Sequence, residues 1–205
     1  MEKLSKKIIS NILDLGKIDF SGFSSSEMWC GYFEAKDNVV KCEDAYNLVQ
    51  GYFKSLDQFF ALTALCYGEF KNKNIFNKYS NGTDLSFFEK AKELGILKKL
   101  TDKFDGYLIG DNDLPIEHLT LTFDENIYFS LCNLVMHSDL ILGEVCFFIH
   151  PKLNIAIYPH NDIGFGVIAL DSDPTLGIEF LKFCEKDSRF KVNIEPEILS
   201  NISKI

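Results

Sequence analysis

Three short apolar segments in the second half of the chain, separated by brief turn sequences, constrain the fold more than any other feature. The segments comprise residues 140–149, 155–158 and 166–170. The links between them contain Pro151-Lys152-Leu153-Asn154 and Pro159-His160-Asn161-Asp162, which are rich in turn-forming residues. Links this short join antiparallel strands, because a parallel pair needs a crossover of about a dozen residues or more. The pattern therefore predicts three consecutive strands in an antiparallel sheet.

The residues that follow predict a helix and a closing strand. Asp173 can cap a helix whose first residue is Pro174, and this helix is expected to run to about Glu185. Residues 190–194 are expected to form an edge strand. The second half of the chain thus has the predicted order β-β-β-α-β.

The first hundred residues predict mainly helices. Residues 43–79 carry apolar side chains at helical spacing in two adjacent stripes, which indicates a helix packed on two sides. Ser55-x-x-Gln58 resembles a capping box, which would divide this segment into two helices near Lys54. The other elements expected are helices over residues 2–15 and 86–94, a helix capped by Asp124, and a short strand over residues 28–33.

These elements predict an α+β fold with a helical N-terminal half followed by an antiparallel sheet. Residues 1–205 are expected to form a single domain, mainly helical over 1–100 and sheet-containing and acidic over 101–205. Hydrophobic residues make up 46% of the chain, enough to build a core without disulfides or a metal.

Features of the sequence also favour the cytoplasm. Charges interrupt the first ten residues, so no signal peptide is expected, and no apolar segment approaches the ~20 residues that span a bilayer. The six cysteines are widely spaced and most have apolar neighbours, which predicts buried, reduced thiols. No membrane association is expected.

The charge of the chain is concentrated in its second half. Residues 1–100 contain 14 Lys and 13 Asp or Glu, whereas residues 101–205 contain six Lys and one Arg against 17 Asp or Glu, a net charge of −10. An acidic field attracts a basic partner and opposes direct binding of nucleic acid, whose phosphates need clustered Lys and Arg. The acidic residues expected in loops or turns, and therefore expected to bind the partner, are Asp102, Asp105, Asp111, Asp113, Glu117, Asp162, Asp171 and Asp173.

No motif predicts a catalytic centre, a metal site or a cofactor. The chain contains no HExxH or GxSxG motif, and Gly164-Phe165-Gly166 lacks the third glycine and the following helix of a dinucleotide-binding loop. A turn that needs positive φ is the simpler interpretation of these two glycines. Arg189, as the only arginine, is the only side chain that could clamp a phosphate or carboxylate in a bidentate manner.

The segment from Ile155 to Leu170 contains a predicted strand, a turn that places Asp162 before Gly164, and a second predicted strand, and the predicted capped helix follows this segment. The arrangement resembles the C-terminal half of bacterial immunity proteins. These proteins protect a cell from a toxin of the contact-dependent growth inhibition type. The resemblance covers about 50 residues, from about Cys146 to Ile194. It implies a cytoplasmic inhibitor that is not an enzyme and that binds a protein toxin, through an acidic face when the toxin is a basic nuclease. It carries over no functional residue.

Three hypotheses follow. The first is an immunity protein that neutralises a basic toxin through its acidic second half. The second is a small metal-dependent or acid–base enzyme that uses His150, His160 and Asp162. The third is an intracellular adaptor module.

Overall fold

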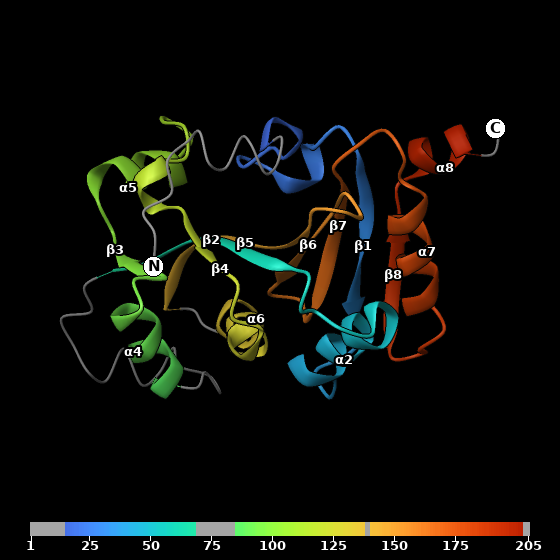
Figure 1. Cartoon of the computed structure of the whole chain (residues 1–205), viewed down its shortest axis with the longest axis horizontal. Coiled ribbons are helices and arrows are strands. Elements are labelled where there is room, and N and C mark those ends of the chain that lie inside the picture. The colour runs from blue at the N-terminus through green and yellow to red at the C-terminus, as the bar shows by residue number, and fades with distance from the viewer. Residues whose placement is uncertain (1–14, 69–84, 138–139, 203–205) are drawn as a thin grey trace.

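The computed structural model describes residues 15–68, 85–137 and 140–202. Within these residues the chain forms an α+β fold around one mixed, eight-stranded sheet, with helices interspersed between the strands (Figure 1). No helix in this part of the chain has both the length and the apolar character needed to cross a membrane.

The strands are β1 Trp29–Ala35, β2 Phe60–Tyr67, β3 Leu97–Lys99, β4 Thr120–Thr122, β5 Ile141–His150, β6 Ile155–His160, β7 Gly164–Ala169 and β8 Phe190–Ile194. The α-helices are α2 Cys42–Phe53, α4 Leu85–Glu93, α5 Asp102–Leu108, α6 Tyr128–His137, α7 Thr175–Cys184 and α8 Pro196–Ile202. The 3-10 helices are η1 Leu15–Lys17, η2 Phe23–Ser25, η3 Ile116–His118 and η4 Glu125–Ile127.

The sheet has the strand order β3-β2-β5-β6-β7-β1-β8, and β4 also pairs with β2. The three strands predicted in the second half are confirmed as β5, β6 and β7, which pair in antiparallel register, with Phe148 opposite Ile157 and Ile157 opposite Val167. The predicted helix after Pro174 is α7, and residues 190–194 form β8. The short turns therefore account for the antiparallel pairing of β5, β6 and β7.

The predicted helical N-terminal half is wrong. Helix α2 ends at Phe53, Lys54 has a φ of +67°, and the chain then enters β2, which pairs with β5 near the centre of the sheet. Residues 60–66 are nearly all apolar, and all of them are buried. Apolar residues therefore also fall at helical spacing, although this segment is a strand. Ser55 Oγ accepts a hydrogen bond from Asp57 N in the connecting turn and caps no helix. The rest of the predicted helix, from residue 69 to 79, lies outside the described residues.

Two other strands contradict a sheet confined to the second half. Strand β1, close to the expected residues 28–33, lies between β7 and β8, and β3 pairs with β2 in parallel, so the sheet is not purely antiparallel. The predicted helix over 86–94 is confirmed as α4, after which Gly95 adopts a φ of +69°. The predicted helix over residues 2–15 lies almost entirely outside the described residues.

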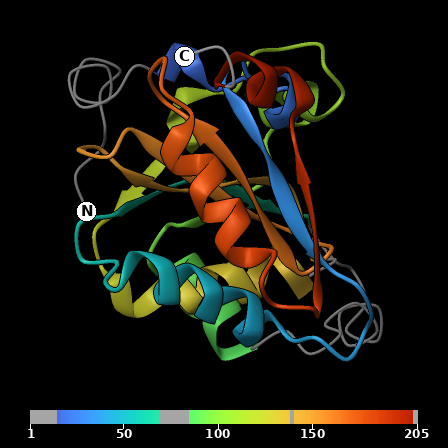
Figure 2. The ribbon, with the colours of Figure 1, turned by 90° about the vertical axis from the view of Figure 1, so that its right-hand side faces the viewer.

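The sheet has a buried hydrophobic cluster on each face. One cluster joins the sheet to α2, α4, α6 and α7, and the other joins it to Ile18, Phe104 and the aromatic residues of segment 15–28. Figure 1 shows α2, α4 and α6 on one side of the strongly twisted sheet and segment 15–28 with α5 on the other. Figure 2 shows α7 in front of the sheet, running alongside β1. All six cysteines are buried, as expected.

Gly164 and Gly166 are not turn residues with positive φ, which corrects the interpretation made from the sequence. Both lie in β7, and neither has a positive φ. A Cβ at Gly164 would overlap the Phe33 carbonyl oxygen, and one at Gly166 would overlap the Tyr158 ring. Glycine is required here because backbone and side chain approach closely.

Candidate functional site

The eight predicted partner-binding residues do not form one face. Asp102, Asp105, Asp111, Asp113 and Glu117 lie on α5 or in the segment that follows it, and we call them the α5 acidic group. Asp162 lies in the turn before β7, whereas Asp171 and Asp173 lie beyond the other end of that strand. The structure therefore separates the predicted set into distinct surfaces.

The N-terminal part of the α5 acidic group lies on a helix, although the sequence pattern had indicated a loop. Thr101 caps α5 by accepting a hydrogen bond from Phe104 N at 3.3 Å, and Phe104 is fully buried against the sheet. Asp102 and Asp105 are exposed in the first turn, where carboxylates interact favourably with the helix dipole. A threonine followed by acidic residues is a helix-start signal that the sequence interpretation missed.

The chain turns back against α5 immediately after the helix ends. Asp111 N and Asn112 N both donate to Gly106 O, at 2.8 and 3.2 Å, and Asn112 Nδ2 donates to Lys103 O. A Cβ at Gly106 would overlap the Asn112 amide, so glycine permits this close return. Asp111 and Asn112 are thereby held beside the helix.

Most carboxylates of the α5 acidic group have no ionic partner among residues 15–68, 85–137 and 140–202. Glu117 forms an ion pair with Lys103, whose Nζ lies 3.1 Å from Glu117 Oε1. A backbone hydrogen bond and this lysine lower the pKa of the Glu117 carboxyl from its usual value. Within the described residues, the other four carboxylates are exposed and form no ion pair. Their charge is available to attract a cationic partner.

His118 lies beneath α5. His118 is 4% exposed, its ring contacts the Phe104 ring in a tilted arrangement with 4.7 Å between centroids, and its Nε2 lies 3.4 Å from Thr101 Oγ1. Burial, and then the charge of Lys98, lower the pKa of His118. The His118 ring therefore packs against Phe104 and Thr101 at the N-terminal end of α5.

The acidic residues after β7 have structural partners. Asp171 Oδ2 accepts a 2.6 Å hydrogen bond from Asn154 Nδ2, and Asp171 Oδ1 accepts one from Asp173 N. Asp173 Oδ1 in turn accepts from Thr175 N at the start of α7. These carboxylates stabilise the conformation of the loop between β7 and α7.

Asp162 lies in a different electrostatic environment. It lines a pocket of about 300 Å³ together with Glu34 and Asp37. Glu144 is exposed, but partial desolvation by its neighbours, and then the charge of Asp162, raise its pKa. Glu34 forms an ion pair with Lys191 at 3.0 Å. Several carboxylates are thus crowded at this end of the sheet.

The structure does not bring His150, His160 and Asp162 together. His150 lies opposite Ile155 at one end of β6, and His160 is at the other end of the same strand. Five residues of strand separate these ends by about 16 Å, at ~3.3 Å per residue. His150 Nδ1 accepts from Leu153 N, and His160 Nε2 donates to Phe33 O. The described residues include no group of three or more His, Cys, Asp or Glu that could hold a metal ion.

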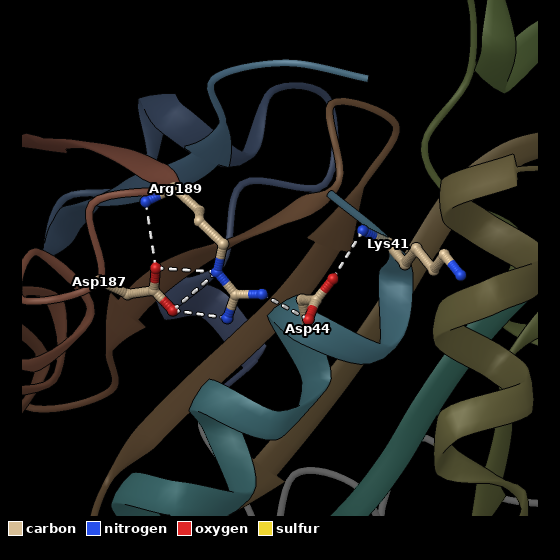
Figure 3. Close-up of polar contacts among 4 residues, drawn as sticks. All are labelled: Lys41, Asp44, Asp187 and Arg189. Carbon is tan, nitrogen blue, oxygen red and sulfur yellow. Dashed lines mark hydrogen bonds and ion pairs between the residues drawn. The ribbon is translucent and has the colours of Figure 1, made fainter. Parts of the chain in front are cut away.

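Arg189 is held by two carboxylates of its own chain, as Figure 3 shows. Its Nη1 donates to Asp44 Oδ1 at 2.6 Å, while its Nε and Nη2 donate to the Asp187 carboxylate. Asp44 Oδ2 also accepts from Lys41 N at the start of α2. The guanidinium thus links α2 to the turn before β8. Its donors bind carboxylates of its own chain, in place of the phosphate or carboxylate ligand that the sequence analysis considered.

Comparison of the chain with protein-family models, with curated proteins and with solved structures found no match.

Proposed function

We propose that this chain is a cytoplasmic immunity-type protein that neutralises a basic protein toxin by binding it through the α5 acidic group. The observation that carries this proposal is that Asp102, Asp105, Asp111 and Asp113 are exposed without an ion pair among the described residues. The net charge of −9 for the whole chain supports the same preference for a basic partner. The resemblance of residues 146–194 to immunity proteins makes a toxin the expected partner.

The charge arrangement suits rapid capture. Complementary fields raise association rates by ~10- to 1,000-fold at low ionic strength, and screening by salt removes most of this gain. A nuclease toxin presents Lys and Arg where its nucleic acid binds, so an acidic protein surface could occupy that site in place of phosphates. Neutralisation would then require binding alone and no chemistry by this chain.

Genomic context and growth rescue test the proposal. We expect the gene for this chain to adjoin a gene for a large secreted toxin, and we expect co-expression of the chain to restore growth of cells that express the toxin domain. If the toxin domain forms no complex with this chain and growth is not restored, toxin neutralisation is wrong. An adaptor module would instead bind a partner that is not toxic.

Charge reversal then tests the surface. Asp111→Lys combined with Asp113→Lys should slow association with the toxin domain and weaken its dependence on salt, because exposed charges act mainly on the encounter rate. Asp171→Lys combined with Asp173→Lys is the matched control, with the same change of charge in a loop whose carboxylates have structural partners. Equal association rates for the wild type and the Asp111/Asp113 variant would exclude the α5 acidic group.

A further inference from the structure

Two exposed aliphatic side chains lie among the carboxylates of the α5 acidic group. Leu108 is 39% exposed and Ile109 is 69% exposed. Among the large apolar residues that are exposed in the described part of the chain, they are the only pair adjacent in sequence. Single exposed apolar residues are ordinary on a protein surface, but adjacent ones ringed by charge resemble an interface with an apolar centre and a polar rim.

Helix geometry places this apolar pair beside the acidic side chains. Asp102 and Asp105 lie one turn apart on α5, and Ile109, the C-cap residue that directly follows the helix, continues their spacing as i, i+3, i+7. Phe104, at the other side of the helix, faces the core, and Leu108 approaches Gly143 of β5 at the boundary between them. The return of Asp111 to Gly106 puts a further carboxylate next to the same helix end. We call this surface, formed by Asp102, Asp105, Leu108, Ile109 and Asp111, the α5 docking surface.

We propose that the α5 docking surface binds a basic amphipathic segment of the protein partner, in which apolar side chains alternate with Lys or Arg. Charge complementarity selects the occupant, because the carboxylates need cationic partners and the aliphatic pair needs apolar contact. A nucleic acid supplies neither, and an uncharged apolar segment leaves the carboxylates without partners. The proposal refines the site named under the proposed function and depends on that site, but it does not require the partner to be a toxin.

Two other surfaces are weaker rivals. The loop that contains Asp171 and Asp173 has acidic residues, but its neighbours Leu170 and Pro174 are buried. Phe123 is 68% exposed and precedes Asp124, yet its ring packs on Phe60 at 5.7 Å and Asp124 caps η4 through Asn126 N. Neither surface combines adjacent exposed aliphatics with several unpaired carboxylates.

The test titrates the full chain with two synthetic peptides of equal positive charge, one of alternating Lys and Leu and one of alternating Lys and Ser. Amide chemical shifts locate the binding surface, and the concentration dependence gives the affinity. The Lys-Leu peptide should bind more tightly and should shift amides of residues 102–111. Ile109→Ser should weaken its binding about tenfold, as expected when one partly buried aliphatic contact is lost. Phe123→Ser, which removes another exposed apolar side chain, should leave the affinity unchanged.

Three outcomes would overturn the proposal. Equal affinity for the two peptides would show that the aliphatic pair contributes nothing. Shifts centred on Phe123 or on residues 171–173 would place the surface elsewhere, and no binding would exclude it. Thermal unfolding of both variants checks that they remain folded.

If the peptide maps to α5 but growth rescue fails, the proposal that the partner is a toxin is wrong and the docking surface stands. If growth is rescued but the peptide does not map to α5, only the docking surface is wrong.

Discussion

Arg189 Nη1 lies 2.6 Å from Asp44 Oδ1, and this contact joins two residues that are 145 positions apart in the chain. The Arg189 guanidinium also binds the Asp187 carboxylate side-on, so that one side chain connects α2 to the turn before β8 (Figure 3). Hydrogen bonding to Arg189 lowers the pKa of Asp187, and a backbone hydrogen bond together with Arg189 lowers the pKa of Asp44.

Removal of this arginine should make the protein less stable in a pH-dependent manner. Because the folded-state pKa of each aspartate is lowered, the stabilisation is present above the usual value of 3.8 and is lost as the pH falls through the folded-state pKa. We expect Arg189→Gln to lower the Tm by a few degrees at neutral pH. In acid, the Tm of the variant should approach that of the wild type. Lys191→Gln, which removes a single-point ion pair with Glu34, should have a smaller effect. A pH-independent difference in Tm would contradict this account.

His118 should make the region around α5 sensitive to acid. Its pKa is lowered in the folded protein, so its neutral form stabilises the fold above the usual value of 6.5, and this stabilisation is lost as the pH falls through the folded-state pKa. Lys98, Lys103 and Glu117 are the charged groups around it. His118→Gln should reduce the loss of Tm between pH 7 and about pH 5. An unchanged pH profile in that variant would assign the acid sensitivity to the other histidines.

The cap of α5 should control the docking surface. Thr101→Ala removes the acceptor for Phe104 N and should cost about 1 kcal/mol, whereas Thr101→Ser keeps the hydroxyl and should cost less. Hydrogen exchange of the α5 amides should accelerate in the alanine variant. Chemical denaturation measures the stability, and exchange in the serine variant provides the control. Equal exchange in both variants would show that the cap does not hold the helix.

Gly164→Ala should be strongly destabilising. The added Cβ would overlap the Phe33 carbonyl oxygen in the neighbouring strand, so β1 and β7 would have to separate, at a cost of more than about 3 kcal/mol. Gly51→Ala is the control, because its Cβ would lie 3.6 Å from Phe183 Cζ in ordinary contact and alanine favours a helix. Unfolding in urea measures both. Similar stability for the two variants would refute the close-approach explanation.

The cysteines should be unreactive until the protein unfolds. Burial raises the pKa of Cys30 to about 11 and of Cys42 and Cys66 to about 12, so few thiolates exist near neutral pH. A thiol reagent should react slowly with the native protein and should detect six thiols in denaturant. Four or fewer thiols in fresh protein purified without reductant would show that disulfides form.

Part of the predicted site follows from the sequence and part does not. The excess of carboxylates after residue 100 is a property of composition, and the exposure of Asp105 or Asp111 follows from their polarity. The helical structure of α5 was missed because its seven residues include only one fully buried apolar side chain, Phe104, which is too few to show periodicity. Asp162 and Asp171 lie at opposite ends of β7, and the surfaces that these two ends face depend on how the sheet is assembled, which no local sequence pattern shows.

Elements whose signals are local could be predicted from the sequence. The strands β5, β6 and β7 and the start of α7 follow from turn residues and capping residues within a few positions of one another. Contacts between distant segments explain why residues 60–67 form a strand, why β1 lies between β7 and β8, and why Arg189 binds Asp44. An all-apolar segment satisfies helix and strand patterns alike, so the partners that bury both of its faces select the conformation.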